Sequence, residues 1–96
     1  MRRRDTQRLA DLLPQVLHDA ELEQPLAELR VVRAWPKVVG QMAASYTADV
    51  AFRNGVLVVR LTSAALRHEL MLSRPQLIAA INREAGTTIV KEVRLV

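Results

Sequence analysis

Three basic residues recur at helical spacing within the 96-residue chain: Arg30, Arg33 and Lys37. Residues three and four apart share one side of a helix, so this spacing predicts a row of positive charge on an exposed helix side. Guanidinium and ammonium groups bind phosphate oxygens, and the row is therefore a candidate nucleic-acid contact. Four further arginines are candidates for the same kind of contact: Arg53, Arg60, Arg74 and Arg94.

The sequence lacks the residue patterns that catalysis and metal binding require. It has no cysteine, and its two histidines, His18 and His68, have no ligand-type neighbours at metal-binding spacing. No phosphate-binding loop, dinucleotide-binding fingerprint or Ser-His-Asp order is present. We therefore expect a protein that is not an enzyme and that carries no cofactor and no metal.

Charge is unevenly distributed along the chain. Residues 1–28 contain four arginines and six acids, whereas residues 29–96 contain ten basic residues and four acids, so the net charges are −2 and +6. A basic body attracts phosphate whatever the base sequence, which makes nucleic acid the first partner to consider. A merely solubilising surface is the alternative, and composition leaves both open.

Length and composition predict one globular domain over residues 1–96. Half of the residues are apolar and 25% are charged, and a chain of this size can hold one modest core. Residues 1–5 are expected to form a flexible basic N-terminus. No apolar run approaches the roughly 20 residues that span a bilayer, and the start does not resemble a secretory signal. We expect a cytoplasmic protein with no membrane contact.

The first third of the chain predicts two helices. Apolar residues from Leu9 to Ala20 recur at helical spacing, with Pro14 expected to bend or divide that helix. The acidic residues after position 18 predict a linker, followed by a second helix with Pro25 in its first turn. Pro36 is expected to end that helix, and residues 37–44 to restart at an angle. The inward stripe of the second helix is Leu26, Leu29, Val32 and Trp35.

Residues 46–62 predict a β-hairpin. Residues 46–53 alternate, with Tyr46, Ala48, Val50 and Phe52 on the expected buried face. Asn54-Gly55 accepts the positive φ angles of a type I′ turn, and residues 56–62 supply the second strand. Arg53 and Arg60 fall on the other, mixed face of this hairpin.

The last third of the chain predicts two helices and a strand. Ser63 is expected to cap the first helix, while Ser73 and Gln76 form a capping-box pattern at the start of the second. Gly86 can close the second helix in a left-handed conformation. Residues 87–96 predict a strand, with Ile89, Val93 and Leu95 on one side and Val90, Glu92, Arg94 and Val96 on the other.

These elements predict an α+β fold in the order α-α-β-β-α-α-β. Four short helices cannot cover both faces of three strands, so we expect a three-stranded mixed sheet with the helices on one face. The last strand can lie parallel to a hairpin strand. If the strand register allows it, Arg53, Arg60 and Arg94 share the open face as a positive surface.

An ordered series of motifs resembles the DciA family. The series runs from Trp35 to Gly40 in W-P-K-V-V-G, through Gly55-Val56-Leu57-Val58-Val59 and Thr62-Ser63 to Glu69-Leu70, and ends with Ile81-Asn82 and Gly86. The resemblance covers about residues 8–95. It implies a type II KH-like fold, α-β-β-α-α-β, with an additional N-terminal helix. It also implies a loader of the bacterial DnaB-type replicative helicase, with affinity for single-stranded DNA and no ATPase machinery of its own.

The KH comparison also indicates where the chain differs from nucleic-acid-binding KH domains. Those domains clamp backbone nucleotides with a G-x-x-G loop, and the corresponding junction here is Leu72-Ser73-Arg74-Pro75. Arg74 could still contact one phosphate at the helix start. Trp35 is interpreted as a core anchor and not as a base-stacking platform.

The leading hypothesis is a non-enzymatic adaptor that binds the replicative helicase and, weakly and through charge, single-stranded or junction DNA. One alternative is a KH-like RNA-binding module associated with the ribosome or RNA processing. The other is a scaffold dimer with no nucleic-acid role.

Overall fold

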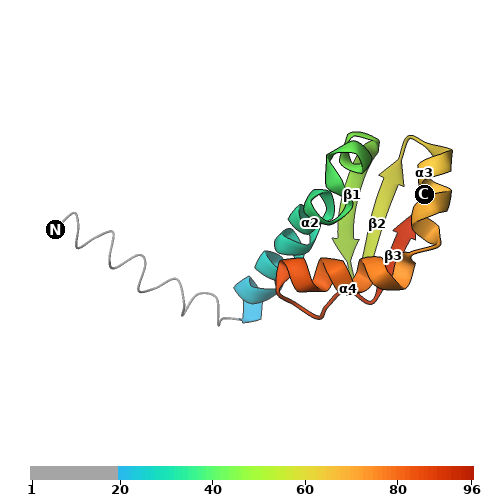
Figure 1. Cartoon of the computed structure of the whole chain (residues 1–96). Coiled ribbons are helices and arrows are strands. Elements are labelled where there is room, and N and C mark those ends of the chain that lie inside the picture. The colour runs from blue at the N-terminus through green and yellow to red at the C-terminus, as the bar shows by residue number, and fades with distance from the viewer. Residues whose placement is uncertain (1–19) are drawn as a thin grey trace.

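The computed structural model describes residues 20–96, with side chains from residue 23 onward. The elements are α2 (Ala20–Ser45), β1 (Thr47–Arg53), β2 (Val56–Leu61), α3 (Ala64–Met71), α4 (Arg74–Ala85) and β3 (Glu92–Leu95) (Figure 1). This order, α-β-β-α-α-β, confirms the predicted α+β fold from the second predicted helix onward. The first predicted helix and the basic start at residues 1–5 lie outside the described residues.

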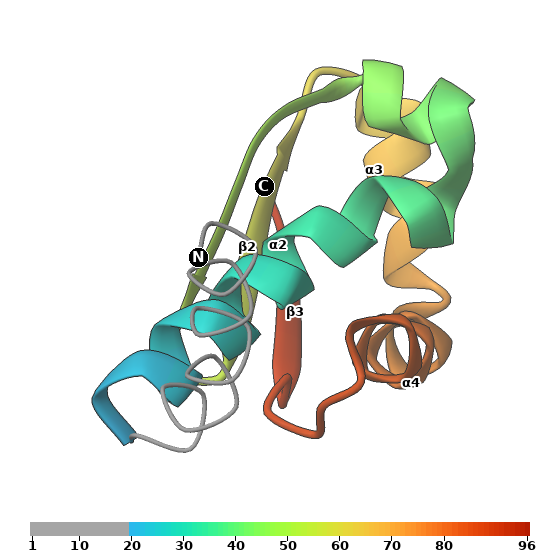
Figure 2. The same cartoon turned by 90° about the vertical axis from the view of Figure 1, so that its left-hand side faces the viewer.

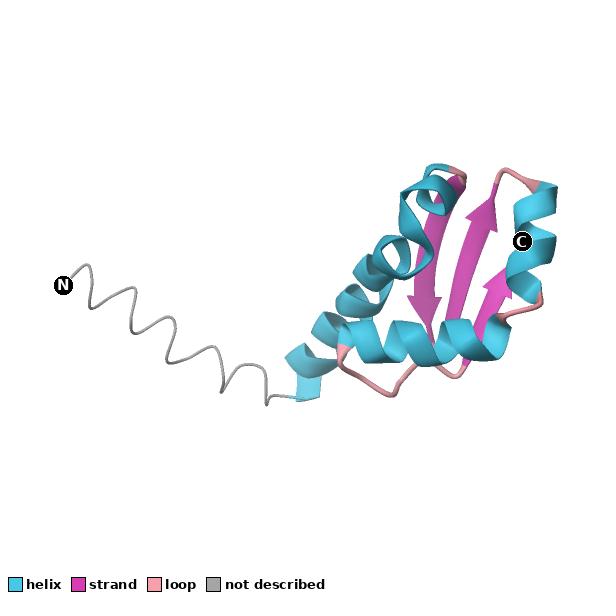
Figure 3. Cartoon of the chain, viewed as in Figure 1, coloured by secondary structure: helices cyan, strands magenta, loops and turns pink. Residues whose placement is uncertain are grey.

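The sheet is mixed and has the strand order β1-β2-β3 (Figure 3). β1 and β2 are antiparallel, and β2 and β3 are parallel. Asn54 and Gly55 join β1 to β2 with φ angles of 53° and 82°, as a type I′ turn requires. The predicted hairpin is confirmed.

One sheet face and the three described helices share a single core. Leu57, Val59 and Leu61 of β2 are buried together with side chains from α2 and α4, and Leu66 and Leu70 of α3 pack against them. Figure 2 shows α3 and α4 on the same side of the sheet. Alternate strand residues therefore point away from the helices, and these include exposed arginines.

Trp35 joins α2 to the start of β1. Its side chain is 1% exposed, and its indole Nε1 donates a hydrogen bond to Thr47 Oγ1 at 3.0 Å. Thr47 Oγ1 in turn donates to the Ala43 carbonyl oxygen at 3.1 Å. The interpretation of Trp35 as a core anchor is confirmed.

A β-bulge changes which residues of β1 face the core. Thr47 pairs with Leu61 and Asp49 with Arg60, which leaves Ala48 as an extra residue. Val50 and Phe52 pack against the core as predicted. The prediction that Tyr46 and Ala48 face the core is wrong, because the extra residue reverses the alternation before the bulge: Thr47 faces Trp35, and Tyr46 is 46% exposed.

The first half of α2 is more continuous than the prolines suggest. The predicted linker before Pro25 is wrong from residue 20 onward, since α2 already begins at Ala20 and carries Pro25 inside it. Gln24 Nε2 donates to Glu28 Oε2 at 3.0 Å, one helical turn away, and so supports the turn around Pro25.

The break in α2 lies at Gly40 and not at Pro36. Trp35 and Ala34, next to Pro36, are buried, and this packing holds the helix together although proline removes one of its hydrogen bonds. Gly40 has φ 91° and ψ 166°, a combination that is essentially restricted to glycine. The prediction of a break at Pro36 is therefore wrong by four residues.

Helices α3 and α4 differ in how their ends are capped. Ser63 Oγ accepts a hydrogen bond from the Leu66 amide at 3.1 Å and caps α3 as predicted. Ser73 stands at the start of α4, but its hydroxyl makes no capping hydrogen bond, so the predicted capping box is wrong. The backbone at Ser73, with ψ 21°, is outside the extended conformation typical of a capping residue. Gly86, with φ 69° and ψ 38°, closes α4 as predicted.

Asn82 determines how the chain approaches β3. Its side chain donates to the Val90 carbonyl oxygen at 3.1 Å and accepts from the Val90 amide at 3.0 Å. These two bonds hold Val90 at 2% exposure. β3 is therefore shorter than predicted, and the prediction that Val90 lies on the side away from the core is wrong.

Replacing Gly40 by alanine should destabilise the fold through the backbone alone. A Cβ at this position would meet no atom within 4 Å, so the cost is that of the unusual φ and ψ, about 1–3 kcal/mol. Gly86→Asn is the control, because asparagine tolerates the left-handed conformation and should cost less than about 1 kcal/mol. Urea unfolding measures both, and equal losses would show that the break at Gly40 imposes no special backbone requirement.

Candidate nucleic-acid interface

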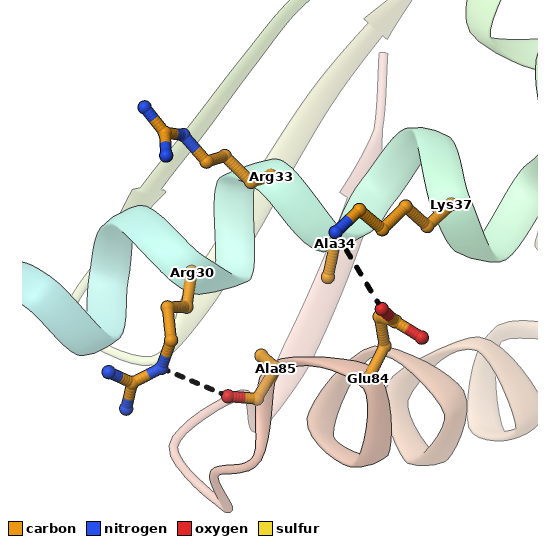
Figure 4. Close-up of a pocket in the computed structure, with 6 residues that line it drawn as sticks. All are labelled: Arg30, Arg33, Ala34, Lys37, Glu84 and Ala85. Carbon is orange, nitrogen blue, oxygen red and sulfur yellow. Dashed lines mark hydrogen bonds and ion pairs between the residues drawn. The ribbon is translucent and has the colours of Figure 1, made fainter.

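The predicted basic row on α2 lines a pocket against the end of α4. Arg30, Arg33 and Lys37 are all exposed, and with Ala34, Glu84 and Ala85 they surround a pocket of about 220 Å³. Arg30 Nε donates to the Ala85 carbonyl oxygen at 3.1 Å, and Lys37 Nζ lies 3.9 Å from Glu84 Oε2. Figure 4 shows these two side chains reaching toward α4 while Arg33 points away.

The electrostatics of this pocket favour a structural role for two of its three cations. The C-terminal end of a helix carries partial negative charge, and a cation placed there stabilises it. Arg30 occupies that position at the end of α4, and Lys37 neutralises Glu84. A phosphate bound here would compete with Glu84 and with the helix end, so the pocket is a poor anion site.

The face of the sheet that points away from the core carries the other predicted arginines. Arg53, Arg60 and Arg94 come from β1, β2 and β3, and all are exposed. Arg60 and Arg94 alternate with buried residues, and Arg53 follows the half-buried Phe52. The predicted sharing of one face is therefore observed. The register places Asp49 opposite Arg60, and Glu92 Oε2 lies 3.2 Å from Arg94 Nε. Acids thus offset part of this positive charge.

Tyr46 adds an aromatic ring that the sequence pattern assigned to the core. Tyr46 stands in the turn directly before β1, and its carbonyl oxygen accepts from the Thr62 amide at 2.8 Å. This bond places Tyr46 opposite Thr62, two residues after Arg60 on the second strand of the hairpin. The Tyr46 side chain is 46% exposed, which is enough for a base to stack on it. The signal for this placement is the bulge at Ala48, which the alternating sequence does not reveal.

Arg74 lies apart from the α2 row, at the start of α4. It lines a second pocket, of about 350 Å³, together with Pro75, Ile78, Lys91, Glu92 and Val93. The Ser73 hydroxyl does not cap this helix start. Lys91 is a basic residue that the sequence analysis did not select, although its place directly after the β-branched run 87–90 could have indicated it.

Within residues 23–96, no group of three or more histidine, cysteine, aspartate or glutamate side chains is placed to hold a metal ion. None of the helices in this part of the chain is both long and apolar enough to cross a membrane. The candidate site consists of the exposed basic side chains, with the exposed residue Tyr46 beside them.

Comparison with known families shows to which protein family this chain belongs. A family model described as Dna[CI] antecedent, DciA, matches residues 8–95. The chain belongs to the DciA family. Its DciA relatives include a UPF0232 protein of Bifidobacterium longum, 37% identical over 70 residues, which are 73% of this chain and 44% of the relative.

Two further relatives of this DciA-family chain are UPF0232 proteins of mycobacteria. The one from Mycolicibacterium paratuberculosis is 29% identical over 92 residues, or 96% of this chain and 51% of the relative. The one from Mycobacterium leprae is 31% identical over 87 residues, which cover 86% of this chain and 46% of the relative. The chain spans about half the length of the curated relatives it matches.

The motif residues that carry the DciA resemblance are architectural in this structure. Trp35 anchors α2 to β1, Gly40 breaks α2, Asn82 holds Val90, and Gly86 closes α4. None of them belongs to the basic surface. Lys37, which stands within W-P-K-V-V-G, is the one residue of the motif series that is also among the predicted basic contacts.

Replacing Arg30 by alanine should destabilise the protein more than replacing Arg33, because only the Arg30 side chain caps the end of α4. Arg30→Ala should lower the free energy of unfolding by about 0.5–1.5 kcal/mol, the net value of one hydrogen bond. Arg33→Ala, its matched control one turn away, should stay within about 0.5 kcal/mol of the unchanged protein. Urea unfolding at two salt concentrations measures both. A larger loss for Arg33 than for Arg30 would contradict the capping role.

Proposed function

We propose that this chain is a non-enzymatic adaptor of the bacterial cytoplasm that binds a DnaB-type replicative helicase and single-stranded or junction DNA during helicase loading. Membership of the DciA family over residues 8–95 is the observation that carries the proposal. The basic sheet face supports the DNA part, and the lack of a metal cluster among residues 23–96 is compatible with an adaptor.

We place DNA contact on the open sheet face. Arg53 and Arg60 have no ion-pair partner within the described residues, whereas Arg94 is paired with Glu92. Tyr46 supplies a ring on which one base can stack. Because few cations and a single exposed ring are available on this surface, binding is expected to be weak and strongly dependent on salt.

Removing the free arginines of the sheet should weaken DNA binding and reduce its salt dependence. Each phosphate contact on a single strand contributes about 0.7 to the slope of log affinity against log salt, so the Arg53→Gln/Arg60→Gln variant should lose up to about 1.4 in slope. The measurement is fluorescence anisotropy with oligothymidine over a salt series.

The matched control for this experiment is Arg33→Gln/Arg83→Gln, which removes the same charge from exposed positions on α2 and α4. It should leave the slope nearly unchanged. Tyr46→Ala should lower affinity without changing the slope, since stacking releases no counterions. Equal effects of the two double variants would refute a localised sheet site. Tighter binding to a matched RNA would favour the KH-like RNA-binding alternative.

Helicase binding is tested separately from DNA binding. Purified DnaB-type helicase from the same bacterium should be retained by the immobilised chain at salt concentrations that abolish oligothymidine binding. The Arg53→Gln/Arg60→Gln variant should retain it equally well, because the proposal assigns those residues to DNA. No retention by the unchanged chain would refute the helicase-directed part of the proposal, whatever the DNA result.

A further inference from the structure

Two large apolar side chains are exposed where α3 passes into α4. Met71, the last residue of α3, is 44% exposed, and Leu72, directly after it, is 69% exposed. Neither is part of the core that the described residues form. The backbone here is fixed, because the Leu72 amide donates to the Glu69 carbonyl oxygen at 3.2 Å. Adjacent exposed apolar side chains on an ordered backbone are typical of a protein contact surface.

A groove lies beside this pair, between the first turns of α4 and β3. It is the pocket of about 350 Å³ described above, and its apolar lining includes Pro75 and Ile78 of α4. Pro75 is exposed, while Ile78 is half-buried and packs against the core. Leu72 precedes Pro75 by three residues, and Figure 1 shows α3 leading directly into α4. The exposed pair and the groove therefore form one surface, which we call the α3–α4 junction.

The charge around the groove selects the kind of partner. Arg74 and Lys91 line the groove and are both exposed. The one acidic lining residue, Glu92, is paired with Arg94 at 3.2 Å. The uncompensated charge at the groove is therefore positive, which complements an acidic partner.

The conformation of the partner follows from the burial of β3. Val93 is 0% and Leu95 is 9% exposed, so β3 offers a partner no accessible backbone groups at these two positions. A helix satisfies its backbone hydrogen bonds internally and presents side chains alone. A helical partner therefore suits a surface that consists of side chains.

We propose that the α3–α4 junction binds an acidic amphipathic helix of a partner protein. Apolar side chains of that helix cover Met71 and Leu72, and one of them enters the groove beside Pro75. Acidic side chains flanking the apolar stripe meet Arg74 and Lys91. The arginines of the open sheet face take no part in this surface, and the proposal does not depend on DNA binding.

A protein helix fits the junction better than a membrane or a DNA strand does. An apolar lipid layer takes up protruding side chains, but it does not fill a recess that is lined by Arg74 and Lys91. The lining residues of the groove include no aromatic ring on which a base could stack. DNA would also leave Met71 and Leu72 without an apolar partner.

The apolar contact is tested with the whole 96-residue chain and a labelled helical peptide, by fluorescence anisotropy. The peptide carries one leucine stripe at spacings of three and four, with glutamates beside the stripe. Leu72→Gln should weaken binding at least about fivefold, as expected for a central contact residue. The matched control Met42→Gln, at a methionine of α2 that is 74% exposed, should change it less than about twofold. A peptide of equal composition with its leucines scattered around the helix should not bind.

An exchange of charge tests the electrostatic contact. Arg74→Glu/Lys91→Glu should weaken binding of the glutamate peptide at least about tenfold, and this variant should bind a peptide whose glutamates are replaced by lysine. The unchanged chain should not bind the lysine peptide. Arg83→Glu, on the same helix but outside the groove, should change binding of the glutamate peptide less than about twofold. Arg53→Gln/Arg60→Gln should bind the glutamate peptide normally, so failure of the sheet site and failure of the junction are distinguishable.

Three outcomes would overturn the proposal: no binding of the glutamate peptide, equal binding of the scattered peptide, or equal losses from Leu72→Gln and Met42→Gln. Binding to phosphatidylglycerol vesicles that requires Leu72, without binding of the peptide, would also overturn it, because the junction would then be a membrane site. The same holds for oligothymidine binding that requires Leu72, which would make the junction a nucleic-acid site.

Discussion

The Trp35 side chain is the contact on which the rest of this structure depends. It is 1% exposed and donates to Thr47 Oγ1, which itself donates to Ala43. These bonds join the two ends of the segment that contains the break at Gly40. They also require Thr47 to face the core, and the bulge in β1 supplies that orientation. The buried Trp35 side chain thus connects three features: the position of α2, the break at Gly40 within α2, and the alternation of residues in β1.

Helix α4 organises the charges of the molecule through its two ends. At its C-terminal end, Arg30 bonds to the last carbonyl oxygen of the helix and Lys37 pairs with Glu84, so cations are used to hold helices together. At its N-terminal end, Arg74 stands beside Lys91 with no acid of the helix nearby. The sign of the helix dipole makes the first arrangement stabilising and leaves the second available to anions. Basic residues with similar exposure therefore have different roles.

Four residues of the DciA motif series shape the backbone and take no part in the candidate binding surfaces. Trp35, Gly40, Asn82 and Gly86 fix the backbone, while exposed arginines and one tyrosine form the surface outside it. Such a division permits the same architecture to display different surface charges. Family membership consequently identifies the scaffold directly, and the partners have to be argued from the residues that the scaffold displays.

The sequence by itself determined the order of elements from α2 onward, the type I′ hairpin, the Ser63 cap and the end of α4; it placed the three arginines on one sheet face only on condition of the strand register, which the structure supplied. Each of these follows from local propensity or from strict alternation, which act over a few residues. The tertiary structure decided the break at Gly40, the exposure of Tyr46, the burial of Val90 and the use of Arg30 as a cap. Each of these depends on a partner distant in the chain: Trp35 selects Thr47, Asn82 holds Val90, and Arg30 reaches Ala85 across 55 residues. Local patterns carry no record of such contacts, because their energy arises only when the chain has folded.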